Sequence, residues 1–74
     1  MTVTVKAFGS VATRLKKTGA VVLPDGINLI ELKEVLGLPK NYPVCFVVNG
    51  VVAPADQVLK DDDDISIINH IAGG

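Results

Sequence analysis

Cysteine, histidine and aromatic residues are scarce in this 74-residue sequence, which has one Cys, one His, two Phe, one Tyr and no Trp. The lone Cys45 cannot form an intrachain disulfide, and a small domain without such cross-links is typical of a reducing compartment. One cysteine and one histidine are also too few for a structural zinc site or an iron–sulfur cluster, which need about four ligands. We therefore predict no bound metal, and we interpret Cys45 as a small core residue rather than a nucleophile.

An excess of charge of either sign is also missing, because seven Lys and Arg against eight Asp and Glu give a formal net charge of −1. This balance argues against nucleic acid or an anionic membrane as a partner. No apolar run approaches the roughly 18 residues that span a bilayer, and the first residues lack a signal-peptide pattern. The expected location is the cytoplasm. Neither GxxxxGK[ST] nor GxGxxG occurs, so we expect no cofactor bound by this chain itself.

Aliphatic residues are what the sequence does contain, and 49% of it is hydrophobic. That is enough for the core of one small domain spanning residues 1–74. Apolar and polar residues alternate as in strands with one buried face. We predict strands at residues 1–8, 20–23, 44–48, 51–52 and 64–71, with Phe46 pointing inward and Val47 outward. Between the third and fourth strands, Asn49-Gly50 predicts a type I′ turn, which needs positive φ at both residues.

A single main helix is predicted between the second and third strands. Asn28 is the expected N-cap, with Glu31 completing a capping box. The apolar stripe is expected to hold Leu29, Leu32, Val35 and Leu36, with Glu31, Lys33 and Glu34 on the opposite side. A short helical turn capped by Ser10 is expected after the first strand. The acidic run at residues 61–64 is interpreted as a solvated turn, because it lacks the alternating ligands and the glycine of a calcium loop.

This order of elements predicts an α+β domain, in which a mixed sheet of four to five strands carries one main helix on one face. At this length, the order resembles the β-grasp or ubiquitin-like fold. The Asn49-Gly50 hairpin, the turn at residues 59–61, the strand start at Asp64-Ile65 and the final Gly73-Gly74 resemble the bacterial sulfur-carrier family. That family includes the small subunit of molybdopterin synthase and the thiamin-pathway sulfur carrier. Where it often has Gly in the acidic turn, this chain has Asp62, which tolerates a left-handed conformation better than most residues.

The branch of the family stays open. The long first connection, residues 9–19, is more similar to the molybdopterin branch, whereas the compact helix and Asn49-Gly50 are more similar to the thiamin branch. The approach to the tail, residues 70–72, is similar to neither.

The resemblance implies a sulfur carrier that is not itself an enzyme. An E1-like adenylating enzyme would use Mg-ATP to adenylate the carboxylate of Gly74, and sulfur would then displace AMP to leave a thiocarboxylate. A synthase, such as the molybdopterin synthase large subunit or thiazole synthase, would accept the sulfur. Gly73 and Ala72 are small enough to thread into a narrow channel, and residues 71–74 are expected to form a flexible tail.

The uncovered face of the sheet is the expected docking surface for these partners, with Val47, His70 and Ile71 as candidates. His70 could titrate near neutral pH, although an incidental polar strand end is the simpler interpretation. Two other functions remain open. One is a ubiquitin-like modifier conjugated to other proteins through Gly74, and the other is a non-catalytic β-grasp binding module.

Overall fold

The computed structural model describes residues 1–69. Its elements, in chain order, are β1 (Thr2–Phe8), the 3-10 helix η1 (Ser10–Thr13), β2 (Gly19–Val22), α1 (Leu29–Val35), β3 (Val44–Val48), β4 (Val51–Ala53) and β5 (Asp64–Asn69). The five predicted strands and the main helix are confirmed to within one or two residues at their ends. The two final residues of the last predicted strand, 70 and 71, lie outside the described residues.

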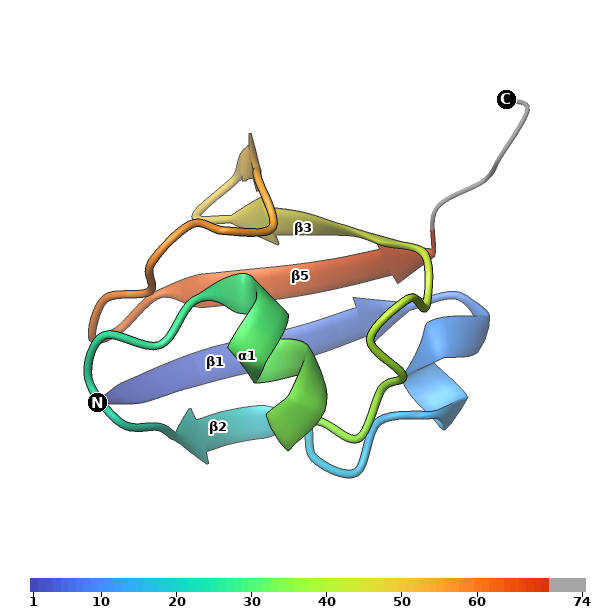
Figure 1. Ribbon diagram of the computed structural model, residues 1–74, viewed down its shortest axis with the longest axis horizontal. Coiled ribbons are helices and arrows are strands. Elements are labelled where there is room, and N and C mark those ends of the chain that lie inside the picture. The colour runs from blue at the N-terminus through green and yellow to red at the C-terminus, as the bar shows by residue number, and fades with distance from the viewer. Residues whose placement is uncertain (70–74) are drawn as a thin grey trace.

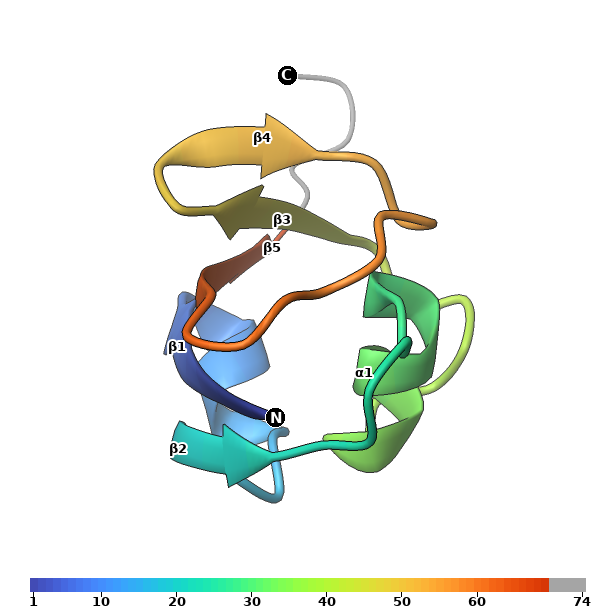
Figure 2. The same ribbon diagram turned by 90° about the vertical axis from the view of Figure 1, so that its left-hand side faces the viewer.

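The five strands form one mixed sheet in the order β2-β1-β5-β3-β4 (Figure 1). β1 and β5 run parallel at its centre, and the other neighbouring pairs are antiparallel. A parallel pair requires a crossover connection, and α1 lies on that connection, over one face of the sheet (Figures 1 and 2). The predicted α+β architecture is therefore confirmed. No helix in residues 1–69 is long and apolar enough to cross a membrane.

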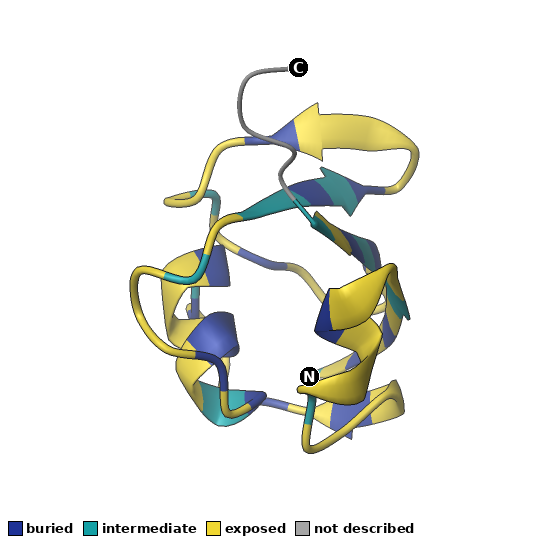
Figure 3. Cartoon of the chain, turned by 90° about the vertical axis from the view of Figure 1, so that its right-hand side faces the viewer, coloured by how far each residue is buried: buried dark blue, intermediate teal, exposed yellow. Residues whose placement is uncertain are grey.

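The core lies between the sheet and α1, as the buried positions in Figure 3 show. Alternate residues of the central strands point into it, and Phe46 is buried as predicted. The fully buried large side chains are Val3, Val5, Val11, Leu29, Leu32, Leu36, Ile65 and Ile67. Val35, which was predicted to belong to the apolar stripe of α1, packs against this core but is only partly buried.

Lys33 departs from its prediction, because it is buried rather than on the polar side of α1, with only 8% of its surface exposed. Its Nζ donates hydrogen bonds to the backbone carbonyls of Lys40, at 3.0 Å, and Tyr42, at 2.7 Å. The loop after α1 thus folds back toward the helix and supplies both hydrogen-bond acceptors of the ammonium. Burial lowers the pKa of the Lys33 ammonium below its usual value.

The start of α1 agrees with the prediction. The Asn28 side-chain oxygen accepts a hydrogen bond from the Glu31 amide at 2.9 Å, and a Glu31 carboxylate oxygen accepts one from the Asn28 amide at 3.1 Å. This reciprocal capping box satisfies two amides that have no partner inside the helix. Ser10, in contrast, does not cap η1, because the N-cap position is occupied by Gly9, which has no side chain to accept a hydrogen bond.

The hairpin between β3 and β4 has the predicted turn. Asn49 and Gly50 have φ of 52° and 83°, so both residues adopt the left-handed conformation that a two-residue type I′ connection requires. The Asn49 side chain accepts from the Asp64 amide at 2.9 Å and donates to Asp63 Oδ1 at 2.9 Å. The turn is thereby fastened to the beginning of β5.

Candidate functional site

The face of the sheet that α1 leaves uncovered carries apolar side chains toward the carboxyl end of β5. We call this group the open-face cluster, and it consists of Phe8, Cys45, Val47, Val52 and Ile68. The exposed fraction is 54% for Phe8, 74% for Val52 and 39% for Ile68, whereas Cys45 and Val47 are half-buried. Exposed apolar side chains on a sheet face are notable when they are contiguous.

Strand register makes the open-face cluster continuous. Phe8 lies opposite Ile68 across the parallel pair β1–β5, and Ile68 lies opposite Cys45 across β5–β3. Val47 follows Cys45 on the same face of β3 and lies opposite Val52. Since side chains opposite each other on one face have Cβ atoms about 4.5–5.5 Å apart, the five residues form a single surface across four strands.

Polar residues border this surface on the side where β5 begins. Ser66 lies opposite Val47 on one side and opposite Lys6 on the other. The Lys6 ammonium forms an ion pair with the Asp64 carboxylate at 3.6 Å, and both side chains are about half exposed. An apolar patch with a polar rim is the anatomy of a protein–protein interface.

The side chains of β3 agree with one prediction and differ from another. Val47 does point to the uncovered face, as predicted. Cys45 differs from its prediction, because it lies on this face and not in the core. The alternation that turns Phe46 inward must turn both of its neighbours outward, so the pattern of β3 itself contained the signal for Cys45.

The carboxyl end of β5 is held by its last described residue, Asn69. The Asn69 side-chain oxygen accepts a hydrogen bond from the Val11 amide at 2.7 Å, and its Nδ2 donates to Ser10 Oγ at 3.0 Å. Gly9, at φ 83°, passes so close that a Cβ there would lie 2.9 Å from the Asn69 oxygen. β1 and β5 are paired up to Phe8 and Ile68. Asn69 therefore links β5 to the segment that follows β1 just beyond the last pair of the two strands.

The model of the ThiS family matches residues 5–74, which is nearly the whole chain. The chain belongs to the ThiS family. Among solved structures, it is similar to the solution structure of Urm1 from Trypanosoma brucei, with 25% sequence identity and a TM-score of 0.67, over 99% of this chain and 95% of that one. No curated protein matches.

Membership of the ThiS family confirms the resemblance to ubiquitin-like sulfur carriers, and the similarity to Urm1 confirms the β-grasp fold. The residues that the sequence assigns to the chemistry of this ThiS-family chain are Ala72, Gly73 and Gly74, and those assigned to docking include His70 and Ile71. All five lie outside the described residues, and their roles stay predictions. The structure places Val47, which belongs to the open-face cluster.

The acidic run of the ThiS-family chain holds a turn together, and it is less solvated than predicted. Asp63 is buried, and its carboxylate accepts from the Lys60 amide at 2.8 Å and from Asn49 at 2.9 Å. Asp61 accepts from the Thr2 amide at 2.8 Å. Asp62 has φ of 70°, in agreement with the expected left-handed conformation. Within residues 1–69, no three His, Cys, Asp or Glu side chains gather as a metal site would require.

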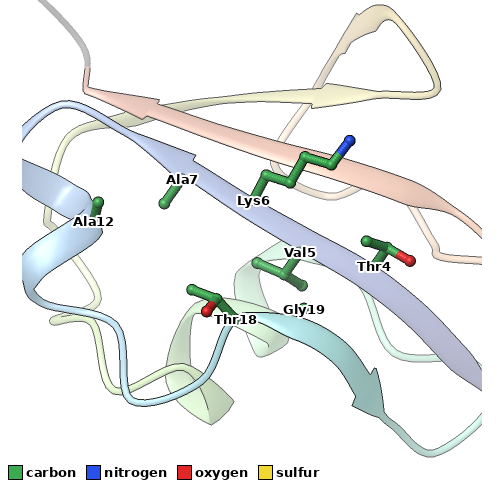
Figure 4. A pocket seen from close by; sticks show the side chains of 7 residues that line it. All are labelled: Thr4, Val5, Lys6, Ala7, Ala12, Thr18 and Gly19. Atoms are coloured by element: carbon green, nitrogen blue, oxygen red, sulfur yellow. The ribbon is translucent and has the colours of Figure 1, made fainter.

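A shallow hollow lies beside β1, where β2 begins (Figure 4). It exists because β1 pairs with β2 only as far as Val5 and Gly19, so the next part of β1 has η1 and the loop before β2 as neighbours. The polar side chains around it are Thr4, Lys6 and Thr18. Lys6 extends toward β5, where Asp64 holds its ammonium. The hollow therefore concentrates no groups suited to acid–base or nucleophilic chemistry.

Sequence reasoning missed several residues that the structure brings to this end of the molecule. Phe8, Ile68 and Val52 join Val47 in the open-face cluster, and the period-two pattern of their strands was the available signal. Asn69 was also missed. The available signal was that Asn69 is polar although it has the same phase in its strand as Ile65 and Ile67, which are fully buried.

Proposed function

We propose that this protein is a sulfur carrier whose Gly74 carboxylate is activated by an E1-like adenylating enzyme. The carboxylate attacks the α-phosphorus of the partner's Mg-ATP and releases pyrophosphate. A sulfur nucleophile supplied by another protein then displaces AMP, so that one sulfur atom replaces one carboxylate oxygen. The resulting thiocarboxylate is passed to a sulfur-accepting synthase of the molybdopterin or thiamin type.

The observation that carries this proposal is the ThiS-family match over residues 5–74, a range that includes Gly73-Gly74. A carboxylate is a poor electrophile until its oxygen becomes part of a good leaving group, and adenylation makes that change. In this proposal, the ATP, metal and sulfur donor belong to other proteins, and the carrier supplies the reacting carboxylate rather than a catalytic group. The single Cys45 is consistent with the reducing cytoplasm as the place of action.

The open-face cluster supports the proposal because it offers a surface on which a partner enzyme can bind. A small carrier must be gripped so that its terminal carboxylate reaches the partner's ATP. The cluster includes Ile68, one residue before the end of β5, so a partner that covers it also lies beside the point where the chain continues toward Gly74. We propose that the E1-like enzyme docks on this surface, including Val47, with His70, Ile71 and Ala72 leading to the threaded Gly73.

Intact-mass spectrometry of the protein purified from its native host tests the proposal. The expected result is a fraction of molecules whose mass has gained one sulfur-for-oxygen exchange, localised by fragmentation to Gly74. Protein made in a host without the adenylating enzyme, or lacking Gly74, is the control and should show no gain.

Two results would contradict the sulfur-carrier proposal and point elsewhere. Covalent adducts between Gly74 and lysines of other proteins, without any thiocarboxylate, would indicate a modifier. Full function in a variant that lacks residues 73–74 would indicate a binding module.

A further inference from the structure

Asn69 makes two side-chain hydrogen bonds that reach across 58 and 59 residues of sequence. Its oxygen accepts from the Val11 amide, and its Nδ2 donates to Ser10 Oγ. Both acceptor and donor ends of the amide are thereby used. On the helix-covered face of β5, Ile65 and Ile67 precede Asn69 in the same phase and are fully buried. An aliphatic residue at position 69 would continue that packing. The amide instead fastens the end of β5 to η1.

Gly9 shows how closely this contact is made. It has φ of 83°, and a Cβ built on it would lie 2.9 Å from the Asn69 side-chain oxygen, closer than real Cβ contacts occur. A side chain at position 9 would thus both strain the backbone and displace the Asn69 amide. We call the three residues Asn69, Ser10 and Val11, with Gly9 packed against them, the exit clamp.

The exit clamp fixes the origin of the segment that leads to Gly74. On one side of Asn69 is β3, where Val44 is its partner in the register, and on the other are Ser10 and Val11. Gly74 follows five residues later, and five residues span at most about 18 Å when fully extended. A change in the direction or position of Asn69 would therefore shift the place to which a partner-bound carrier delivers its carboxylate.

We infer that Asn69 is a positioning residue for adenylation: it fixes the position and direction of the last described residue of β5, from which the segment to Gly74 continues, so that the Gly74 carboxylate meets the partner's ATP. This inference rests on the proposed function. Asn69 is remote from the reacting atoms and acts through the geometry of the segment that follows it. The open-face cluster would supply binding, whereas the exit clamp would supply alignment of the bound carboxylate.

The test is carrier-dependent ATP–pyrophosphate exchange with the E1-like enzyme of the same organism, measured over a range of carrier concentrations. Asn69→Leu keeps the size of the side chain and removes both hydrogen bonds. We expect it to lower kcat by about tenfold, because small misplacements of reacting groups are costly, with KM within about twofold of the wild type. Asn69→Asp keeps an acceptor for the Val11 amide, and the Ser10 hydroxyl can donate to it. This variant should restore most of kcat.

A variant in the β3–β4 turn, which is hydrogen-bonded to the beginning of β5, serves as the matched control. Asn49→Gly removes the two side-chain hydrogen bonds that hold the hairpin to Asp63 and Asp64, while glycine keeps the positive φ of the turn. It should lower stability while leaving kcat close to that of the wild type. A purely structural role for Asn69 would instead reduce the folded fraction, which raises the apparent KM and leaves kcat unchanged.

The outcomes separate this inference from the proposed function. If the wild-type carrier supports no exchange, the proposed function fails and the role of Asn69 fails with it. If the wild type is active and Asn69→Leu has the same kcat, only the role of Asn69 is overturned. Should Asn69→Leu not fold in a urea titration, Ser10→Ala, which removes one of the two hydrogen bonds, replaces it. Its expected loss in kcat is about threefold, and an unchanged kcat would overturn the role equally.

Discussion

Lys33 shows at the scale of one residue how a cation can be buried without an acidic partner among residues 1–69. Its Nζ donates to two backbone carbonyls, those of Lys40 and Tyr42, and the residue as a whole is buried. Arg14 stacks its guanidinium 5.6 Å from the centre of the Tyr42 ring on the same loop, a distance at which a cation–π attraction operates. The loop after α1 is thus held by two cations from different elements.

The stability contributed by Lys33 should increase with pH in the alkaline range. Burial lowers the pKa of its ammonium below 10.5 in the folded state. Between that lowered pKa and 10.5, the unfolded chain therefore binds more protons than the folded one, and the free energy of unfolding rises with pH. The neutral amine keeps enough N–H groups to donate to both carbonyls.

Urea unfolding of the wild type and of Lys33→Met, from neutral pH to the ordinary lysine value of 10.5, measures this effect. The Met variant lacks the titrating group but shares all the others. The wild type should be more stable than Lys33→Met at neutral pH by about 1–3 kcal/mol, and the difference should widen as the pH rises. A difference that narrows toward high pH would show that the ammonium, not the amine, is the better fit for this site.

Gly73 is the second residue for which a single substitution is informative. The proposed function needs the chain to enter a narrow channel of the adenylating enzyme, and a methyl group at position 73 adds bulk beside the reacting carboxylate. Gly73→Ala should therefore lower carrier-dependent pyrophosphate exchange by about tenfold or more. Its urea midpoint should equal that of the wild type. Normal exchange by this variant would contradict the threading role of Gly73.

At the scale of elements, α1 depends on its capping box, because a helix of seven residues has too few internal hydrogen bonds to be stable alone. Asn28→Ala removes the acceptor for the Glu31 amide and should lower the free energy of unfolding by about 1 kcal/mol. For a domain of this size, that corresponds to a fall in Tm of roughly 4–8 °C.

Glu31→Gln is the matched control for the cap, because an amide oxygen can still accept from the Asn28 amide. Thermal unfolding should show a clearly smaller loss in Tm for Glu31→Gln than for Asn28→Ala. Equal losses would mean that the charge of Glu31 at the start of α1 contributes as much as the hydrogen bond that Asn28 accepts.

The second element-scale device is the anchoring of β5 at both ends by asparagine side chains. Asn49 holds its beginning through Asp63 and the Asp64 amide, and Asn69 holds its end through Val11 and Ser10. β5 is central, with β1 and β3 as neighbours. The strand that leads to the proposed reacting group is thus fixed in register as well as in direction.

At the scale of the whole molecule, the sequence sufficed for the features that depend on local patterns. Period-two alternation located the strands, and the capping box and Asn49-Gly50 located the start of the helix and the hairpin turn. What it could not show depends on contacts between distant residues. A lysine such as Lys33 is expected to be solvated, and it is buried here because the loop at Lys40 and Tyr42 folds over it. Asn69 meets Val11 only because β1 and β5 are parallel neighbours.

The division of the sheet into a covered and an uncovered face allows docking to be tested with two adjacent residues. Val51 and Val52 are both well exposed on the edge strand β4, at 68% and 74%. Val52 lies on the uncovered face opposite Val47, whereas Val51 lies opposite Val48, which points to the other face. The two valines thus match in type, strand and exposure and differ in the face they occupy.

If the E1-like enzyme covers the open-face cluster, Val52→Ser should raise the KM for the carrier in pyrophosphate exchange by roughly tenfold, since burying a valine side chain contributes about 1.5 kcal/mol or more. Val51→Ser should leave KM within about twofold of the wild type, and kcat should be unchanged in both. Equal effects of the two substitutions would place the partner on the edge of the sheet or elsewhere. A rise in KM for Val52→Ser together with a fall in kcat for Asn69→Leu would assign binding to the uncovered face and alignment to the end of β5, which are distinct tasks on one small sheet.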